Sequence, residues 1–364
     1  MILILTAGFG DGHNSAARNV MQGLNRLAPD EQVRVVDAFD HAHPVLSPVL
    51  KQLYQVLITR APWLWAWTYA RSARMEFDGK LDWLSALRRA VAGLLAEHQP
   101  RAIVSSYPLY AKILQQLRAE GLAVPSFSTI ITDSITIHPA WMLARSDRWF
   151  VADEDSKQSL VALGAPVQDV HVTGFPVSLH FMVSATPPSG GLAPGRILYL
   201  PSTHANHVAA TLEALRPLLN TGVKLTLPVG KHASRLYHVV HRFLDSLPGA
   251  DIEVLGWTNR IPELLQTHDF VICKAGGAIL HEALAATCPA IIDYVVPGQE
   301  EGNARLLTMH ECGVTTASPR ETGAQAARLV ANACAEARRM KANMRAHSVP
   351  DAALKIARHV LSLG

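Results

Sequence analysis

The sequence predicts an α/β protein made of two Rossmann-like domains that face each other across a cleft. Short apolar runs rich in β-branched residues alternate with longer helical patterns, and this alternation starts twice within 364 residues. The apolar runs are continuous, which is typical of parallel sheets that are covered on both faces. A chain of this length also fits two domains better than one core. Ligands of such sheets bind at the carboxyl ends of the strands, so we expect the site in the cleft.

The first half of the chain carries the first sheet. We predict strands at 2–7, 32–38, 101–107, 126–133, 147–153 and 170–176. Helical patterns cover 15–27, 109–119 and 155–163, together with one long region, 44–97. These segments form an N-terminal domain, 1–183. The stretch SATPPSGGLAPG at 184–195 is rich in Pro, Gly and Ser and is interpreted as a linker.

The same pattern restarts after this linker. We predict strands at 196–202, 223–230, 252–257, 269–277 and 289–295. Helices are predicted over 206–219, 234–246, 260–266, 278–286, 302–311 and 320–345. Together they form a second domain, 196–345. A last helical segment, 346–364, is expected to pack back on the first domain.

Composition and charge exclude several classes of protein. A net charge of +3 is too small to indicate a nucleic-acid partner. The four cysteines are isolated and form no C-x-x-C pair, so neither a zinc site nor a disulfide framework is indicated. The chain opens on a strand-like run without a basic segment before it, and it contains no apolar stretch of spanning length. We expect a cytoplasmic protein that at most lies on a membrane.

The stretch GFGDGHNSAA, residues 8–17, is the first candidate site. It joins the first predicted strand to a helix, and its glycines, Gly10 and Gly12 among them, let the backbone approach a ligand closely. His13 lies at the mouth of that helix, where the helix dipole disfavours the protonated ring and keeps it a neutral base. The alternative is a tight turn with an incidental histidine.

The second candidate site begins with Lys274-Ala275-Gly276-Gly277, which ends a buried strand and starts a helix. This geometry suits a diphosphate. Glu282 lies further along that helix, where a carboxylate accepts hydrogen bonds from two vicinal ribose hydroxyls. The next predicted strand is followed by Pro297-Gly298-Gln299-Glu300 and then Asn303, which are suited to sugar hydroxyls. The alternative is a set of solvated loops.

Three segments in this order resemble the family of monogalactosyldiacylglycerol synthases and processive diacylglycerol glycosyltransferases, which are related to the glycosyltransferase that forms lipid II. They are TAGFGDGHNSAA, the section from TDSITIHPAWML to VHVTGFPV (132–177), and KAGG…EAL…PGQEEGN. The resemblance implies a GT-B fold and a UDP-sugar donor. It also implies inversion at the anomeric carbon, a lipid acceptor and no required metal or other cofactor.

The resemblance also implies roles on the donor side. Gly276 and Gly277 would face the diphosphate, Glu282 the ribose, and Gln299 and Glu300 the hexose. The backbone around Trp257–Ile261 would face the uracil. Gly230-Lys231-His232 resembles the family's GKN turn, and Lys231 either balances the diphosphate charge or is a plain turn lysine.

His13 would be the general base on the acceptor hydroxyl. Asp133, at the end of a predicted strand, would orient His13 or replace it as base, and helix capping explains this aspartate equally well. Two departures concern the phosphate contacts. The turn LPSTHANHV (200–208) has no glycine, so Ser202, Thr203, His204 or His207 would have to supply donors, and Ile279 stands where relatives place Thr or Ser.

The region around residues 51–97 is the candidate membrane contact. Ten Lys and Arg against four Asp and Glu give residues 41–118 a charge of +6, and four of the seven tryptophans lie there. Tryptophan beside arginine on a helix is typical of elements that lie in a membrane interface. The contacts would be Trp63, Trp65, Trp67, Arg71 and Arg74. The alternative is a pair of helices whose tryptophans fill the core.

Together with the motifs, the family resemblance implies an inverting hexosyltransferase that moves a hexose from a UDP-hexose to a lipid, most simply diacylglycerol. It would work on the anionic inner face of the cell membrane, without a cofactor, metal or nucleic acid. Two alternatives remain. One is a glycosyltransferase with a polyprenyl or soluble acceptor, and the other is a catalytically weak protein that binds a sugar nucleotide or lipid.

Overall fold

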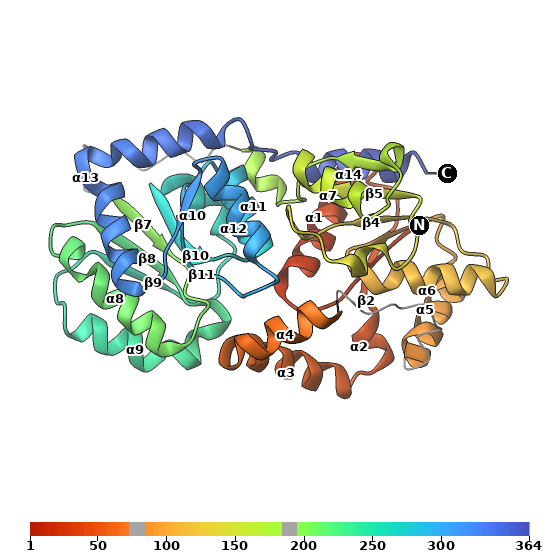
Figure 1. Ribbon diagram of the computed structural model, residues 1–364, viewed down its shortest axis with the longest axis horizontal. Coiled ribbons are helices and arrows are strands. Elements are labelled where there is room, and N and C mark those ends of the chain that lie inside the picture. Colours follow the sequence, from red (N-terminus) through yellow and green to blue (C-terminus); the bar gives the residue numbers. More distant parts are fainter. Residues whose placement is uncertain (73–83, 184–194, 364) are drawn as a thin grey trace. The chain divides into compact units, whose positions relative to one another are not determined.

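A computed structural model describes residues 1–72, 84–183 and 195–363. The chain divides into two compact units (Figure 1). The first contains Met1–Leu179 together with two later segments, Val296–Gly302 and Val349–Gly364. The second contains His180–Val295 and Asn303–Ser348. Of the linker expected at 184–195, residues 184–194 lie outside the described part of the chain.

The first unit is built on a six-stranded parallel sheet with the strand order β2-β1-β3-β4-β5-β6. Its strands are β1 (Ile2–Thr6), β2 (Val33–Asp37), β3 (Ala102–Ser105), β4 (Ser126–Ile130), β5 (Arg148–Val151) and β6 (Val170–Val172). Every residue of β1 and β3 is buried, as the continuous apolar runs predict for strands covered on both faces.

The second unit holds another six-stranded parallel sheet, ordered β12-β11-β10-β7-β8-β9. Its strands are β7 (Arg196–Tyr199), β8 (Lys224–Pro228), β9 (Ile252–Leu255), β10 (Phe270–Lys274), β11 (Ala290–Tyr294) and β12 (Gly313–Thr315). The predicted α/β class with two parallel sheets is therefore confirmed. Strand β12 was not predicted, because its three residues are too few to produce a periodic pattern.

Helices connect the strands in both units. Those of the first unit are α1 (Asp11–Leu27), α2 (Ala38–Ala42), α3 (Leu46–Arg60), α4 (Pro62–Ser72), α5 (Ser85–His98), α6 (Pro108–Ala119), α7 (Glu154–Ala162) and α14 (Ala352–Leu361). Those of the second are α8 (Ala205–Leu219), α9 (Ala233–Asp245), α10 (Ile261–Thr267), α11 (Gly277–Ala285) and α13 (Pro319–Met344, broken at 331–334). Helix α12 (Glu301–Met309) begins in the first unit and continues in the second.

Several predicted boundaries were wrong, and three of them concern segments near the candidate sites. Helix α1 begins at Asp11 rather than Ser15, because Gly10 is its N-cap and the following glycine-containing residues form its first turn. The long helical region 44–97 contains separate helices, since α3 ends before the Ala61-Pro62 pair and Pro62 starts α4. Strand β4 ends at Ile130, so Asp133 lies in the loop after it.

The C-terminal helix α14 packs against α1 in the first unit (Figure 1). Contact between the two backbones is close, because a Cβ added at Gly23 of α1 would lie 2.5 Å from the carbonyl oxygen of Ala353. The same added Cβ would lie 3.3 Å from Cβ of Ala357, and α14 carries the buried apolar residues Leu354, Ile356 and Val360. The last helix of the chain thus completes the first unit rather than the second.

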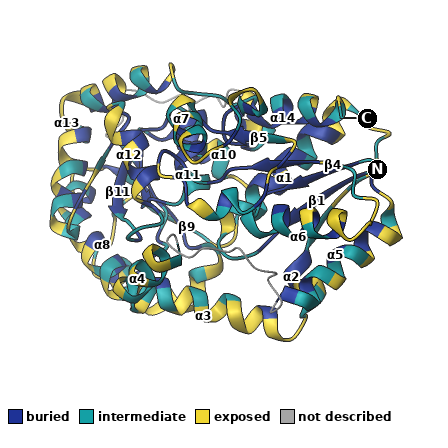
Figure 2. Ribbon diagram, turned by 45° about the vertical axis from the view of Figure 1, so that its right-hand side comes forward, coloured by how far each residue is buried: buried dark blue, intermediate teal, exposed yellow. Residues whose placement is uncertain are grey.

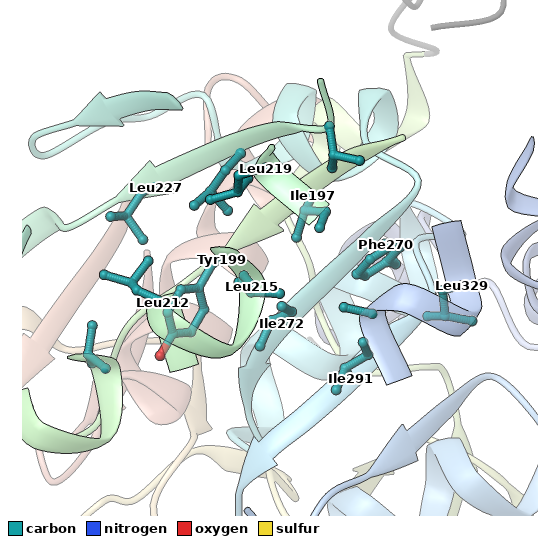
Figure 3. Packing of buried hydrophobic residues seen from close by; sticks show 14 of the residues in the cluster. Ile197, Tyr199, Leu212, Leu215, Leu219, Leu227, Phe270, Ile272, Ile291 and Leu329 are labelled. Atoms are coloured by element: carbon teal, nitrogen blue, oxygen red, sulfur yellow. The ribbon is translucent and has the colours of Figure 1, made fainter. Parts of the chain in front are cut away.

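The core of the second unit lies on its sheet (Figure 3). Leu212, Leu215 and Leu219 of α8 pack with β-strand residues such as Ile197 and Ile272.

A buried histidine of the second unit, His268, is 2% exposed, with Nδ1 2.7 Å from the Leu264 carbonyl and Nε2 2.8 Å from Thr226 Oγ1. This geometry fits a neutral ring in which Nδ1–H donates and Nε2 accepts. Burial lowers the pKa of His268 to about 4 from its ordinary value of 6.5.

The stability of the protein should therefore fall as the pH drops from 6.5 to about 4. In this window the unfolded chain binds a proton at His268 and the folded chain does not, which costs about 1.4 kcal/mol per pH unit. Urea denaturation at several pH values measures this slope. A His268→Asn variant should be less stable at pH 7 and should show a slope smaller by about one proton. An unchanged slope would contradict the assignment of a neutral His268.

Candidate active site

The glycine loop after β1 is fixed by its own contacts. The Gly8 amide donates to Asp37 Oδ2 over 2.7 Å, and Lys51 Nζ of α3 binds the same oxygen at 2.6 Å. A Cβ at Gly8 would lie 2.8 Å from Lys51 Nζ, and Gly10 has a left-handed φ of +97°. Gly12 is different, because a Cβ there would meet no heavy atom within 4 Å. The contact with Lys51 therefore bears on Gly8 and the left-handed backbone on Gly10, and neither reason applies to Gly12.

His13 lies in the first turn of α1, within a group of buried and half-buried side chains. Its Nδ1 is 3.0 Å from Thr132 Oγ1. Its ring packs edge-on against Tyr107 at 5.1 Å and lies 6.1 Å from the ring of Trp141. Burial lowers the pKa of His13 to about 4, and a hydrogen-bond interaction with the Ser106 backbone acts in the opposite direction. The ring is therefore neutral at pH 7, with burial as the main cause.

The contact with Thr132 bears on which nitrogen of His13 can act as a base, because the Thr132 hydroxyl can either accept a hydrogen bond from Nδ1–H or donate one to Nδ1. If Nδ1–H donates to Thr132 Oγ1, the lone pair lies on Nε2, which can then accept a proton. This is the arrangement that general-base chemistry requires, in which one ring nitrogen is held and the other is presented. Sequence reasoning missed Thr132. The signal that could have found it is its position directly before Asp133, after a buried strand.

Asp133 is held by other groups. Its Oδ2 accepts hydrogen bonds from Trp141 Nε1 at 2.7 Å and from the His138 amide at 3.2 Å. Burial raises the pKa of Asp133, while the hydrogen bonds from Trp141 and His138 act in the opposite direction. These contacts join Asp133 to Trp141 and His138, whereas His13 contacts Thr132, so the role of Asp133 in orienting His13 stays a prediction. Through these hydrogen bonds Asp133 also supports the loop after β4.

The predicted sugar-binding stretch Pro297–Glu300 lies within Val296–Gly302, a segment of the first unit. Gln299 Oε1 accepts a hydrogen bond from the Tyr54 hydroxyl at 3.0 Å. Glu300 is 7% exposed, and its Oε2 accepts from the Val296 amide at 3.0 Å, so this carboxylate helps to close its own loop. Gly298 has a φ of +80°, a conformation that favours glycine. Tyr54, 245 positions away in the chain, was not predicted.

The KAGG turn of the second unit has the predicted form. Strand β10 ends at Lys274, Gly276 is the N-cap and α11 begins at Gly277. Asn303, predicted to face a sugar, is 6% exposed and its Nδ2 donates to the Ala275 carbonyl at 3.1 Å. This side chain therefore supports the turn. Glu282 lies on α11 and is half-buried.

The other predicted donor residues lie in the same unit. Gly230, with a φ of +51°, and Lys231 form a short 3₁₀ turn after β8. Trp257 follows β9 and is 81% exposed, and Ile261 begins α10. These residues follow successive strands of one parallel sheet, whose carboxyl ends share an edge.

The glycine-free turn after β7 has polar contacts of its own. His204 is the N-cap of α8, and its Nδ1 accepts from the His207 amide at 3.1 Å. His207 Nε2 lies 3.2 Å from Oδ2 of Asp293, which is 5% exposed. Thr203 is also buried, at 3% exposure. The turn that lacks glycine is therefore lined by imidazole and hydroxyl groups.

Helices α3 and α4 carry many exposed positions (Figure 2), and several of these are large apolar residues. Trp63 and Trp67 are 72% and 60% exposed, and the Arg71 guanidinium lies 5.8 Å from the Trp67 ring. Trp65 is half-buried and packs on Tyr54, with the ring centroids 5.0 Å apart, so it does not share the exposure of its neighbours. Arg74 lies outside the described residues. On α3 the exposed large apolar residues, which sequence reasoning missed, are Leu46, Val49, Leu50, Leu53 and Val56.

These exposed residues of α3 recur with helical spacing, so they form one stripe. With Trp63 and Trp67 of α4 we call them the α3–α4 apolar face. The opposite side of α3 carries Lys51 and Tyr54, which contact Asp37 and Gln299. Among the described residues, no helix combines the length and the hydropathy needed to cross a bilayer.

Comparisons with known proteins indicate which family this chain resembles. Residues 13–177 match the family model for monogalactosyldiacylglycerol (MGDG) synthase. The predicted family resemblance is confirmed. The matched segment begins at His13 and includes Thr132 and Asp133. The chain is also 28% identical to a processive diacylglycerol beta-glucosyltransferase of Bacillus subtilis over 312 residues, which are 83% of this chain and 80% of that protein.

Solved structures show the fold. A UDP complex of MnaA from S. aureus has a TM-score of 0.63 at 14% identity and covers 100% of this chain and 97% of its own. MurG of Acinetobacter baumannii has a TM-score of 0.62 at 14% identity and covers 99% of both chains. The GT-B fold expected from the family resemblance is thereby confirmed.

Proposed function

We propose that this protein is an inverting glycosyltransferase that moves a hexose from a UDP-hexose to the free hydroxyl of diacylglycerol. The observation that carries the proposal is the neutral His13, held through Nδ1 by Thr132 at the start of the segment that matches the MGDG synthase model. The name of the Bacillus subtilis relative supports diacylglycerol as acceptor and glucose as one hexose to test.

In this mechanism, Nε2 of His13 accepts the proton of the acceptor hydroxyl while that oxygen attacks the anomeric carbon. The bond from this carbon to the β-phosphate oxygen breaks, and UDP leaves with the bonding electrons. Attack from the face opposite UDP inverts the configuration. The neutral ring suits this step, because a protonated imidazole has no lone pair to accept a proton.

On the donor side, Gly276 and Gly277 at the N-terminus of α11 would hold the diphosphate. Backbone N–H groups and the helix dipole stabilise the negative charge on departing UDP. Glu282 would bind the ribose, Gln299 the hexose, and the backbone around Trp257–Ile261 the uracil. MnaA, which has the same fold, was solved in complex with UDP, which supports a uridine nucleotide as ligand.

The protein would reach its acceptor as a peripheral protein on the inner face of the cell membrane. Its α3–α4 apolar face would enter the interface, while Arg60 and Arg71 contact anionic headgroups. Each cation near such a surface contributes about 1 kcal/mol. Arg60 and Trp67 are both exposed, and Arg71 lies beside the Trp67 ring, the combination that interfacial helices use.

Replacing Val49 and Val56 of α3 by serine should weaken binding to anionic vesicles by roughly 10-fold, since two apolar side chains no longer leave water. Co-sedimentation with vesicles measures this effect. The matched control replaces Val167 and Val172 by serine. These two valines are 57% and 43% exposed, against 57% and 42% for Val49 and Val56. Equal losses in both double variants would contradict a lipid-binding role for α3.

The proposed activity is tested by giving the protein diacylglycerol vesicles and each common UDP-hexose in turn, with released UDP and lipid products analysed together. A glycosyl-diacylglycerol of inverted configuration is the expected product. Transfer only to a polyprenyl or soluble acceptor would overturn the acceptor assignment. Tight UDP binding with no transfer would overturn the enzyme assignment in favour of a binding protein.

A further inference from the structure

Tyr54 lies between the two loops that the proposed reaction uses. Its hydroxyl donates to Gln299 Oε1 over 3.0 Å. Its ring packs edge-on against Phe9 of the glycine loop, with the centroids 6.1 Å apart, and a Cβ at Gly10 would lie 4.0 Å from the hydroxyl oxygen. One side chain of α3 thus contacts both the loop that precedes His13 and the loop that carries Gln299.

The hydrogen bond from Tyr54 orients the Gln299 amide. A glutamine amide is ambiguous, because a half-turn exchanges its acceptor oxygen and its donor NH₂ group. With Oε1 held by the Tyr54 hydroxyl, the NH₂ group is the end that is left to bind a ligand. Burial raises the pKa of Tyr54 to about 12, so the hydroxyl stays protonated and able to donate. The edge-on contact with Trp65 at 5.0 Å holds the ring in place.

A second tyrosine contacts the same loop without such a bond. A Cβ at Gly298 would lie 3.1 Å from Tyr69 Cδ1, so the Tyr69 ring packs directly on the loop backbone. The Tyr69 ring also lies 4.5 Å from the ring of His138. Its hydroxyl has no hydrogen bond to Gln299. Tyr69 therefore supports the loop through its ring, whereas Tyr54 forms a hydrogen bond to it. Comparing variants of these two tyrosines distinguishes the effect of ring packing from the effect of the hydrogen bond.

We propose that Tyr54 is a positioning residue that sets hexose selection by holding Gln299 with its NH₂ group toward the sugar. An amide fixed in this way offers a donor at one place, so it favours the hexose whose hydroxyl oxygen accepts there. Without the bond the amide turns freely and offers either end, and the discrimination between two epimers weakens. This inference rests on the proposed function, in which Gln299 faces the hexose.

The test is a Tyr54→Phe variant, which keeps the ring contacts and removes only the hydroxyl. Binding of UDP, UDP-glucose and UDP-galactose is measured by calorimetry without any acceptor. The ratio of the Kd values for the two UDP-hexoses should move toward 1 by about 3–10-fold, the worth of one hydrogen bond, while the Kd for UDP stays unchanged. The control, Tyr69→Phe, should leave all three values as in the wild-type protein.

A double-mutant cycle with Gln299→Ala decides whether Tyr54 acts through Gln299. In that background Tyr54→Phe should have no further effect on the ratio. An unchanged ratio in Tyr54→Phe, or the same change in Tyr69→Phe, would overturn the inference. Because these measurements need no lipid and no turnover, a failure to glycosylate diacylglycerol would refute the proposed function without affecting this result.

Discussion

Replacing His13 by alanine should lower turnover by roughly 10²–10⁴-fold and leave the affinity for UDP nearly unchanged. The variant loses the proposed base, while the proposed diphosphate site lies on α11, far away in the chain. UDP release at saturating donor and a separate titration with UDP measure the two effects. In the wild-type protein the His13 ring is neutral at pH 7, so its protonation should cause no change of activity with pH near neutrality. Activity should fall as the pH approaches about 4, where His13 becomes protonated.

Two control variants accompany this measurement. Thr132→Val removes the hydrogen-bond partner of Nδ1 but keeps the shape, so it should cause a smaller loss than His13→Ala. Asp133→Asn keeps an acceptor for Trp141 and should also cause the smaller loss. A mild effect of His13→Ala combined with a severe effect of Asp133→Asn would transfer the role of base to Asp133.

Replacing Gly302 by alanine should displace the loop that carries Gln299 and abolish most activity. A Cβ at this position would lie 2.0 Å from the Ser134 carbonyl oxygen and 2.9 Å from the Thr136 amide nitrogen. Both are backbone atoms in the loop beside Asp133, so neither can turn aside as a side chain would. Forcing them apart should lower the free energy of unfolding by about 1–3 kcal/mol. Urea denaturation and turnover assays measure the two losses.

The matched control is Gly93→Ala in α5. A Cβ at Gly93 would meet no heavy atom within 4 Å, and alanine favours the helix by about 0.5–1 kcal/mol. This variant should therefore keep full activity and be slightly more stable than the wild-type protein. If Gly302→Ala behaved in the same way, the close approach of the two loops would be refuted.

The elements of the fold could largely be predicted because their signals are local. Continuous apolar runs such as 2–7 are visible in the sequence and correspond to fully buried strands such as β1. The wrong predictions concern segments in which the local sequence pattern indicates one structure and the folded chain adopts another. The glycines before His13 indicate a loop, yet the first turn of α1 includes Gly12 because helical contacts outweigh its low propensity. On α3 the apolar stripe is typical of a core-facing helix, and only the tertiary structure reveals that it is exposed.

The candidate site could be predicted only in part, for a related reason. Site residues that are neighbours in one motif, such as Gly276 and Gly277, can be recognised from the sequence. Contacts between segments that are distant in the sequence cannot be recognised in this way. His13 and Thr132 are 119 positions apart, and Tyr54 and Gln299 are 245 positions apart. A threonine after a strand and a tyrosine on an amphipathic helix have no unusual pattern of their own, so their roles emerge only from the folded chain.

The last helix has a practical consequence for attempts to divide the molecule. In a truncated protein that ends at residue 183, the surface of α1 around Gly23 would be exposed, because α14 packs there in the full chain. Removing Ala352–Leu361 from the intact chain would expose the same apolar strip and invite aggregation. Anyone who wishes to express the first unit by itself should therefore supply this helix on the same polypeptide, for example by fusing it through a short glycine–serine tether.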